Sequence, residues 1–450
     1  MINISVLQDM NPWWQGKVTE AQKFRRMEFD NIFKSLEKME VTAIIGARRI
    51  GKTTLIKQAI VEILKKTESK NILFINADDV RLEITSYKEL EEIIEYYFSN
   101  ILSKEKSELD KKVYVFIDEA QYVKGWSGLL KSYYDLGFNI KFIVSGSSSL
   151  DILIGASESL VGRLSFYKLY PCSFLDILRF NGINNIDIIS IDGVKEVYEK
   201  LVQLSNTIKI EKFHLLLNRY ITIGGYPQFL AEHDYTRISQ DIQEILSLVV
   251  SKDFVKLFHI TNIEEINKLL IVLASQIGNH SSINSISKNL SLDNKTVQKY
   301  ISYLKEAFMI IEVKQYSKSG VKKLRKNKKF YFWDTGILNT LNAFLNENLI
   351  VNNDYLGKVA EQLVIAHCRK FGEIYYYKNK FEIDIIYKET AIEVKYRNEI
   401  PFSQINLLKE FIHKNNLKFG FIVSKNRLSL EDNILIIPLY LFLYIRFSLI

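Results

Sequence analysis

The sequence lacks the residues and segments that mark disulfide-stabilised, secreted or membrane-spanning proteins. It has only two cysteines, Cys172 and Cys368, and they lie too far apart for a zinc cluster or a disulfide framework. No basic segment followed by an apolar core opens the chain, so no signal peptide is expected. The apolar run 434–445 is split by Pro438 and is shorter than the roughly 20 residues of a spanning helix. We therefore expect a cytoplasmic protein without a membrane segment, ending in a buried strand and a short packing helix.

A large charge of one sign is also missing. The 60 basic and 52 acidic residues leave a net charge of +8, which permits contact with nucleic acid but does not argue for it. Because 47% of the residues are apolar, the chain is not expected to be disordered. Proline and glycine are scarce, at 5 and 19 residues, and we find no internal repeat or low-complexity linker. A chain of 450 residues has room for roughly three domains, each with its own core.

Short apolar runs rich in β-branched residues alternate with helical patterns in the first third of the chain. Because these runs are unbroken rather than alternating, they predict strands buried on both faces, as in a parallel sheet. The expected strands are 41–45, 71–76, 113–117, 140–144 and 164–170, and the expected helices are 53–66, 87–103 and 126–136. Strands that alternate with helices form βαβ units, so this region is predicted to be an open α/β sheet.

The predicted secondary structure changes twice in the rest of the chain. Residues from about 173 to 260 have a helical pattern that the GGYP turn at 224–227 interrupts. Residues 284–313 predict a helix, a turn, a second helix and a strand. Beyond them, the chain predicts a helix over 356–371 and then strands over 373–377, 382–387, 391–396 and 419–423.

The segment GARRIGKTT, residues 46–54, matches the phosphate-binding pattern G-x-x-x-x-G-K-[ST] at every fixed position. It follows an apolar strand and opens a helix, so its backbone N–H groups can point at phosphate oxygens. Lys52 is expected to reach the β- and γ-phosphates, and the Thr53 hydroxyl to bind Mg²⁺. The motif therefore predicts a site for ATP and Mg²⁺. The expected nucleotide-binding residues of the motif are Gly46, Gly51, Lys52, Thr53 and Thr54.

A second strand ends in two acidic residues. In VYVFIDEA, residues 113–120, Asp118 is expected to hold the Mg²⁺ shell and to bind the nucleotide. Glu119 is expected to polarise the water that attacks the γ-phosphate. The alternative is a pair of acids at a strand end that only caps a helix.

Further polar residues are candidates for the same site. Ser145 opens the segment SGSSS at the end of the next strand, between the phosphate loop and Asp118. Ser145 or Ser147 would sense the γ-phosphate, or the segment is a simple polar turn. Arg163 is a candidate for stabilising charge on the nucleotide of its own or a neighbouring subunit, with an ordinary surface arginine as the alternative. Arg48 and Arg49 are expected to shape the loop or contact partners.

The motifs of the first half together resemble an AAA+-like, STAND-related family of P-loop ATPases that is common in archaea and bacteria. The resemblance covers essentially the whole chain and implies a helical lid, in which the GGYP turn would pack the lid over the nucleotide. Ser145 departs from the threonine that relatives often have, but it keeps the hydroxyl group. The residues that carry the resemblance are NPWW at 11–14, Arg25, Arg26, the phosphate loop, FIDEA at 116–120, SGSSS at 145–149, VGR at 161–163 and LYPCSF at 169–174.

A winged helix-turn-helix is predicted over residues 282–313 and the basic segment that follows. Asp293 is a plausible N-cap for the second helix, whose apolar residues share one face. The resemblance implies that this helix enters a DNA major groove while the basic loop contacts phosphates. We therefore predict DNA contact through residues 293–329 and the C-terminal domain. An intramolecular clamp on the lid is the alternative. The basic residues of the loop are Lys322, Lys323, Arg325, Lys326, Lys328 and Lys329.

An acid–acid–lysine pattern appears in EIDIIYKETAIEVKY, residues 382–396. Glu393 and Lys395 are two residues apart on one strand and so point to the same face, with Asp384 on the preceding strand. The pattern resembles the PD-(D/E)xK nuclease fold, and Glu361 on the preceding helix matches an acid that some members add. Asp384, Glu393 and Glu361 would hold Mg²⁺ for phosphodiester hydrolysis, and Lys395 would orient the attacking water. The alternative is a strand whose outward residues happen to be charged.

These features predict an α/β chain with four modules. They are an ATPase core at 1–172, a helical lid at 173–262, a winged helix at 263–335 and a nuclease-like domain at 336–450. The first functional hypothesis is a DNA-processing enzyme in which ATP turnover gates the nuclease. The second is an ATP-driven switch that binds DNA or protein without cleavage. Homo-oligomerisation, the nucleic-acid substrate and the pathway are left open.

Overall fold

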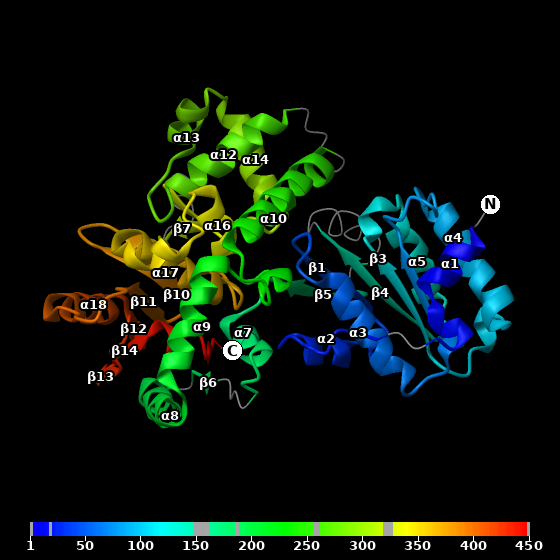
Figure 1. Ribbon diagram of the computed structural model, residues 1–450, viewed down its shortest axis with the longest axis horizontal. Coiled ribbons are helices and arrows are strands. Elements are labelled where there is room, and N and C mark those ends of the chain that lie inside the picture. The colour runs from blue at the N-terminus through cyan, green and yellow to red at the C-terminus, as the bar shows by residue number, and fades with distance from the viewer. Residues whose placement is uncertain are drawn as a thin grey trace. The chain divides into compact units, whose positions relative to one another are not determined.

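The structure is a computed structural model that describes residues 3–17, 20–147, 160, 162–184, 189–191, 193–255, 262–317 and 327–447 (Figure 1). The chain divides into two compact units, Met1–Leu169 and Tyr170–Ile450. Within the described ranges, none of the helices combines the length and the apolar character that crossing a membrane would require.

The first unit is built on a five-stranded parallel sheet with the order β2-β3-β4-β1-β5. All five strands that the apolar runs predict are present, and β1, β3 and β4 are almost entirely buried because helices cover both faces. The open α/β sheet is therefore confirmed. The strands are β1 (Val41–Gly46), β2 (Ile72–Asn76), β3 (Val113–Asp118), β4 (Ile140–Gly146) and β5 (Leu164–Leu169).

Figure 1 shows α3 on one side of this sheet and α4 and α5 on the other. This arrangement follows from right-handed crossovers, because the chain moves one way from β1 to β2 and the opposite way through β3, β4 and β5. The helix expected over 87–103 begins at a Ser86–Glu89 capping box and continues after Tyr96 as one π-helical segment. The helical elements are α1 (Ile4–Met10), η1 (Pro12–Gln15), α2 (Phe29–Ser35), α3 (Lys52–Leu64), η2 (Ser69–Asn71), α4 (Tyr87–Tyr96), η3 (Tyr97–Leu102), η4 (Lys106–Glu108), η5 (Ala120–Tyr122) and α5 (Trp126–Asp135).

The NPWW segment covers the edge strand β2. The Asn11 side chain pairs with Phe74 in both directions, since its Nδ2 donates to the Phe74 carbonyl at 2.8 Å and its Oδ1 accepts from the Phe74 N–H at 2.7 Å. Both Trp13 and Trp14 donate their indole N–H groups to the Ile72 carbonyl. These side chains satisfy backbone groups that an edge strand would otherwise leave to solvent or to another chain.

The second unit contains an eight-stranded mixed sheet with the order β13-β14-β12-β11-β10-β9-β7-β8. The strands predicted near the C-terminus are confirmed, but β7 and β8 lie before residue 336 and belong to the same sheet, because β7 pairs with β9. The boundary expected at 335/336 therefore falls within one sheet. The strands are β7 (Ile310–Gln315), β8 (Lys328–Phe332), β9 (Tyr375–Lys378), β10 (Glu382–Tyr387), β11 (Thr390–Val394), β12 (Phe419–Ser424), β13 (Ser429–Glu431) and β14 (Ile434–Pro438).

Helices surround this sheet and include those expected over 284–306 and 356–371. Residues 434–442 form a buried strand and a short buried helix, as the apolar run predicts. A two-stranded sheet joins β6 (Ile189–Ser190) to β15 (Ile445–Arg446). The helical elements are α7 (Phe174–Phe180), α8 (Val194–Thr207), α9 (Ile210–Ile223), η6 (Pro227–Phe229), α10 (Tyr235–Leu248), η7 (Val249–Phe254), α12 (Ile263–Ser275), α13 (Ile283–Leu290), α14 (Asn294–Glu306), α16 (Thr335–Leu341), η8 (Glu347–Val351), α17 (Asn353–Arg369), α18 (Phe402–Asn415) and α19 (Leu439–Phe442).

The GGYP turn is hydrogen-bonded to two other segments of the second unit. Asp334 caps α16 and also accepts a hydrogen bond from the Gly225 N–H at 2.7 Å, while the Gly225 carbonyl accepts from the Cys172 N–H at 2.8 Å. Burial raises the pKa of Asp334 to about 6, against the effect of its backbone donors. The turn thus ties α9 to α16, and a role in packing a lid over nucleotide stays a prediction.

The predicted helix-turn-helix is present as α13 and α14, followed by β7. Asp293 caps α14 as expected, accepting from the N–H groups of Lys295 and Thr296 at 2.8 and 3.0 Å. The apolar face of α14 is buried, whereas Lys295 and Lys299 are exposed on its other side. The secondary structure agrees with a winged helix, but its identity as a DNA-binding module stays a prediction.

Candidate functional site

The phosphate loop lies between β1 and α3, at the carboxyl edge of the parallel sheet. Gly46 ends β1 so close to β5 that a Cβ atom there would lie 2.2 Å from the Leu169 carbonyl oxygen. Gly51 has a φ of 97°, a conformation that side-chain-bearing residues rarely adopt. Both fixed glycines of the motif are therefore required by backbone geometry. Residues between them turn back so that the N-terminus of α3 faces the loop interior, the arrangement that binds phosphate.

Lys52 is buried within this loop. Its Nζ donates to the carbonyl oxygens of Gly46 and Ala47 at 3.1 and 3.2 Å and lies 3.7 Å from Oε1 of Glu119. Only 4% of the residue is exposed, so the loop fixes the position of the ammonium group. A cation held this way, next to backbone N–H groups, is suited to the charge of a nucleoside triphosphate.

Thr53, Asp118 and Ser145 come together from three elements. The Thr53 hydroxyl donates to Asp118 Oδ2 at 2.5 Å, and the Ser145 hydroxyl donates to Oδ1 of the same carboxylate. This contact exists because β4 lies between β1 and β3, which puts Ser145 between the loop and Asp118 as the sequence predicts. Burial and the neighbouring Glu119 charge raise the pKa of Asp118. A divalent cation beside this carboxylate would offset both effects.

Glu119 is fixed in place by its surroundings. Its φ is 55°, in the left-handed region, and its N–H donates to Ser145 Oγ at 3.1 Å. The Gln121 side chain donates to Glu119 Oε2 at 2.5 Å and to Ser147 Oγ at 3.2 Å. Burial acts to raise the pKa of Glu119, but Lys52 and the Gln121 hydrogen bond outweigh it and lower the pKa. Glu119 is therefore an ionised carboxylate at neutral pH.

Gln121 is a site residue that the sequence analysis missed. It follows the DE pair by two residues in FIDEAQ, and only its place on η5 shows that it reaches Glu119 and Ser147. Arg26 is a second such residue, because its Nη1 donates to the carbonyl of Ile50 inside the loop at 3.1 Å. The sequence placed Arg26 in a family resemblance but not in contact with the loop.

Arg163 lies at the amino-terminal ends of β1 and β5, whereas the phosphate loop follows the carboxyl-terminal end of β1. It immediately precedes β5, and its carbonyl oxygen accepts from the N–H of Val41 at the start of β1. Its Nε is 2.8 Å from Asp135 Oδ1. A six-residue strand is about 20 Å long, so Arg163 does not reach the nucleotide site of its own chain. A role at a neighbouring subunit's nucleotide stays a prediction.

The remaining motif residues line the loop or its flank. Thr54 lies in the first turn of α3. Arg49 has a φ of 60° and so forms part of the tight turn, while the Arg48 side chain donates to the Tyr122 hydroxyl at 3.1 Å. These positions agree with the prediction that the two arginines shape the loop. Ser148 and Ser149 of the SGSSS segment lie outside the described residues.

A second polar site lies in the other unit, where Asp384 on β10 meets Glu393 on β11. Asp384 Oδ2 accepts from the Val394 N–H at 2.8 Å, and the Asp384 N–H donates to Glu393 Oε2 at 3.4 Å. Lys395, just beyond β11, places its Nζ 3.5 Å from Glu393 and 3.9 Å from Asp384. Burial and the Asp384 charge raise the pKa of Glu393 well above its ordinary range. The structure therefore brings the three predicted residues together.

Glu361, on α17, completes this acid–lysine cluster. Burial and the charge of Asp384 raise the pKa of Glu361. Two groups from β8 hold Glu361: Lys329 Nζ lies 3.3 Å from Oε1, and the Tyr331 hydroxyl donates to the same oxygen at 2.5 Å. Lys329 also pairs with Glu382 at 2.6 Å. Lys329 and Tyr331 were not predicted for this site.

Lys329 thus differs from its expected role in a DNA-contacting loop. Only 2% of the residue is exposed, and Lys328 beside it pairs with Glu312 at 3.1 Å. Two of the six cations therefore form ion pairs within the fold, because the strand β8 begins inside the basic segment. The other four, Lys322, Lys323, Arg325 and Lys326, lie outside the described residues.

Each of the two polar sites can hold a metal ion by a few ligands only. In the part of the chain that the structure describes, no three His, Cys, Asp or Glu side chains converge closely enough to enclose a metal. Mg²⁺ commonly takes only one or two protein carboxylates and completes its shell with water and phosphate oxygens. The Thr53–Asp118 pair and the Asp384–Glu393 pair fit that mode of binding. The pKa values of Asp118 and Glu393 are raised, which a bound cation would offset.

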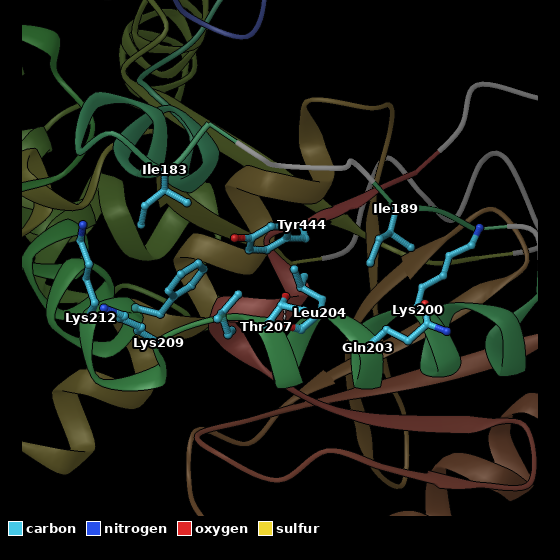
Figure 2. A pocket seen from close by; sticks show the side chains of 11 residues that line it. Ile183, Ile189, Lys200, Gln203, Leu204, Thr207, Lys209, Lys212 and Tyr444 are labelled. Atoms are coloured by element: carbon cyan, nitrogen blue, oxygen red, sulfur yellow. Dashed lines mark hydrogen bonds between the residues drawn. The ribbon is translucent and has the colours of Figure 1, made fainter.

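The second unit also contains a cavity of about 890 Å³ between α8, α9 and the C-terminal segment. Figure 2 shows Tyr444 in the middle of its lining, Lys209 and Lys212 at one end and Lys200 at the other. The described lining residues include no carboxylate and no histidine. None of the residues of the acid–lysine cluster lines this cavity.

Part of the first unit matches a known protein family. Residues 38–178 match the family described as "AAA domain". This segment is therefore similar to AAA-type domains. It contains every residue of the nucleotide site described above except Arg26, and it confirms the predicted P-loop ATPase class for this part of the chain. Residues 214–348, from α9 to η8, match a family described as a domain of unknown function.

Similar proteins are known from archaea and bacteria. An uncharacterised protein of Methanocaldococcus jannaschii is 27% identical over 427 residues, which cover 89% of this chain and 84% of that protein. An uncharacterised protein of Haemophilus influenzae is 24% identical over 76% of this chain and 83% of its own length. Among solved structures, the ADP form of the Aeropyrum pernix ORC2 protein aligns at 13% identity over 77% of this chain and 97% of that chain, with a TM-score of 0.35.

Proposed function

We propose that the chain is a Mg²⁺-dependent ATPase whose turnover controls a phosphodiester-cleaving site in the second unit. The observation that carries the ATPase is the meeting of Lys52, Thr53, Asp118 and Glu119 at one edge of the sheet. Each group supplies a different part of ATP hydrolysis, and an ordinary structural ion pair would not need all of them. The AAA domain match over 38–178 supports this assignment.

The residues of the nucleotide site divide the work. Lys52 and the loop N–H groups bind and neutralise the phosphates, and Thr53 with Asp118 positions the metal. Bound Mg²⁺ would withdraw charge from the phosphate oxygens. Glu119, ionised and held by Gln121, orients the attacking water and accepts its proton. Ser145 joins Asp118 to the Glu119 backbone, so it links metal binding to the position of the base.

The acid–lysine cluster supports the second half of the proposal. Carboxylates from α17, β10 and β11 gather with Lys395, although they are separated by up to 32 residues in sequence. Asp384 and Glu393 would hold Mg²⁺, which polarises the scissile phosphate. Lys395 would orient the water or neutralise charge that develops on the phosphate. The resemblance to PD-(D/E)xK nucleases implies the same chemistry. DNA would contact the exposed lysines of α14 and the basic segment that follows β7.

The ATPase part is tested by Lys52→Ala. The truncation removes a buried ammonium group that should contact the phosphates, so ATP turnover should become undetectable while Lys65→Ala, exposed at the end of the same helix, keeps wild-type turnover. Steady-state phosphate release measures both. Normal turnover by Lys52→Ala would remove the basis of the proposed function.

The cleavage part is tested on DNA and RNA with Mg²⁺ or Mn²⁺, with and without ATP. Asp384→Ala should abolish cleavage, because the variant loses a carboxylate of the proposed metal site. Glu410→Ala, which removes an exposed carboxylate on α18, should cleave as wild type does. If no substrate is cut, or if Asp384→Ala cuts equally well, the alternative of an ATP-driven switch that binds without cleavage is favoured.

A further inference from the structure

The cavity of about 890 Å³ in the second unit has the size of a small-molecule site, since such sites commonly measure roughly 300–1,000 Å³. One face of α8 forms a wall of it, because the α8 residues that line it are three and four positions apart. The turn into α9, the neighbourhood of β6 and the segment before β15 form the other walls. The α8 residues of the wall are Lys200, Gln203, Leu204 and Thr207.

The cavity combines aliphatic walls with cations that have no acidic partner. Among the described residues, neither Lys200 nor Lys209 forms an ion pair, and Lys212 only donates to the Asn181 carbonyl at 3.4 Å. Isoleucine and leucine side chains supply most of the apolar lining. A molecule that complements these walls therefore has a hydrocarbon part and a negative charge.

Tyr444 places a buried hydroxyl group in this cavity. Only 1% of the residue is exposed, and its hydroxyl makes no hydrogen bond to any residue in the part of the chain that the structure describes. The ring stacks on Phe213 with centroids 6.1 Å apart, and Figure 2 shows the hydroxyl oxygen toward the end of the cavity that holds Lys209 and Lys212. Burial raises the pKa of Tyr444, so the group stays protonated. An oxygen acceptor in the cavity would remove the cost of leaving this donor unpaired.

The N-terminus of α9 adds to the positive charge at the same end. No side chain caps this helix, and its N-cap position is Lys209, where Ser, Thr, Asp or Asn is normally favoured. Lys212 is the third residue of the helix, so two cations lie beside the positive end of the helix dipole. Glu211 is in the same turn but is exposed and does not line the cavity. An anion at this end would interact favourably with both lysines and with the free N–H groups of the first turn.

We propose that the cavity binds a small amphiphilic anion, a molecule with a hydrocarbon chain and a single carboxylate or phosphate group. The anionic group lies between Lys209 and Lys212 and accepts a hydrogen bond from Tyr444. The chain lies along the aliphatic wall that includes Leu204. A hydrocarbon chain fits better than a nucleobase, because the rings of Tyr444 and Phe213 already stack on each other. This site is independent of the ATP and phosphodiester chemistry proposed above.

Decanoate binding to the full-length chain tests the proposal, measured by calorimetry and by displacement of the fluorescent probe 8-anilinonaphthalene-1-sulfonate. Decanoate should bind at least about 10-fold more tightly than uncharged decanol, because only the anion gains charge-assisted hydrogen bonds. The double variant Lys209→Gln and Lys212→Gln should remove this difference and leave decanol binding unchanged. Lys195→Gln, an exposed change on α8 outside the cavity, is the matched control. Decyl phosphate, tested beside decanoate, identifies the preferred anionic group.

Two further variants locate the ligand inside the cavity. Tyr444→Phe should weaken decanoate binding roughly 3- to 10-fold without lowering the thermal unfolding temperature, since the hydroxyl has no partner to lose within the described fold. Tyr440→Phe is its control, because that ring also contacts Phe213 but does not line the cavity. Leu204→Trp should fill the space and abolish binding. If Leu204→Trp does not fold, the lysine variants and Tyr444→Phe decide.

Several results would overturn the proposal. They are equal affinity for decanoate and decanol, wild-type decanoate affinity in the lysine double variant or in Tyr444→Phe, and no decanoate binding at concentrations up to about 1 mM. Sedimentation velocity would overturn it in another way if it showed a dimer that Leu204→Trp dissociates, because a second copy of the chain would then occupy the cavity. Failure of ATP turnover or of nucleic-acid cleavage would leave this proposal unaffected, since its readout is binding alone.

Discussion

Replacing Glu119 by glutamine should separate ATP binding from ATP hydrolysis. The substitution keeps the shape of the side chain, and an amide oxygen can still accept the hydrogen bond that Gln121 donates at 2.5 Å. It removes the negative charge, which the lowered pKa of Glu119 shows to be present at neutral pH. The perturbation is therefore confined to the group that would orient water and accept its proton.

The size of the effect follows from the geometry. The backbone of Glu119 is fixed in the left-handed region and by Ser145, so the glutamine amide stays at the same place and no other base moves in. Loss of a positioned general base costs about 10²- to 10⁴-fold in rate, or about 3–5 kcal/mol. Lys52, 3.7 Å away, loses a competing anion, so ATP affinity should stay equal or increase.

Single-turnover phosphate release and fluorescence titration with an ATP analogue measure the two quantities separately. Glu92→Gln, an exposed change of the same chemistry on α4, should leave both unchanged. Turnover within threefold of wild type in Glu119→Gln would show that this residue is not the base. Loss of ATP binding would show that Glu119 maintains the loop rather than hydrolysis.

Three further predictions concern stability and domain structure. Burial lowers the pKa of His367 to about 4, below its ordinary 6.5. His367 therefore contributes stability above pH 6.5 that is lost as the pH falls through 4. Between pH 7 and pH 4.5, His367→Gln should remove about 2.5 kcal/mol of this acid sensitivity, measured by urea unfolding. Asp334 has the opposite effect on the pH dependence of stability, because its pKa is raised from 3.8 to about 6. The free energy of unfolding therefore falls by about 3 kcal/mol as the pH rises across that interval. Asp334→Asn should remove this decline. Equal pH slopes in variant and wild type would contradict either assignment. A fragment of residues 336–450 lacks β7 and β8 and should not fold, whereas 170–450 should; circular dichroism and gel filtration test this, and a folded short fragment would show that the sheet does not need its first two strands.

Much of the first unit is predictable because its determinants are local. Strands buried on both faces must be apolar at every position, which made β1, β3 and β4 visible as unbroken runs. The phosphate loop occupies nine consecutive residues, so its chemistry depends little on distant parts of the chain. The meeting of Ser145 with Asp118 needed one more step, the strand order of the sheet, and the structure confirms that step.

The misplaced residues are those whose partners come from other elements. Arg163 is near glycine and apolar residues in sequence, and only the parallel pairing of β5 with β1 shows that it lies at the far edge from the loop. Gln121 follows the strand-end acid pair, and the local sequence gives no sign of its contact with Glu119. Neither position could be read from a local pattern, because each depends on which strand ends are adjacent.

The basic segment near residue 329 shows most clearly which features the local sequence determines and which depend on the tertiary structure. The sequence alone determined that six cations lie within eight residues and that Asp384, Glu393 and Lys395 form an acid–acid–lysine pattern. Only the tertiary structure decided that Lys329 is buried between Glu361 and Glu382, which follow it by 32 and 53 residues. A solvated lysine and a buried one have the same local sequence signature. The difference arises from packing, because a buried ammonium group is stable only where the fold brings carboxylates to it.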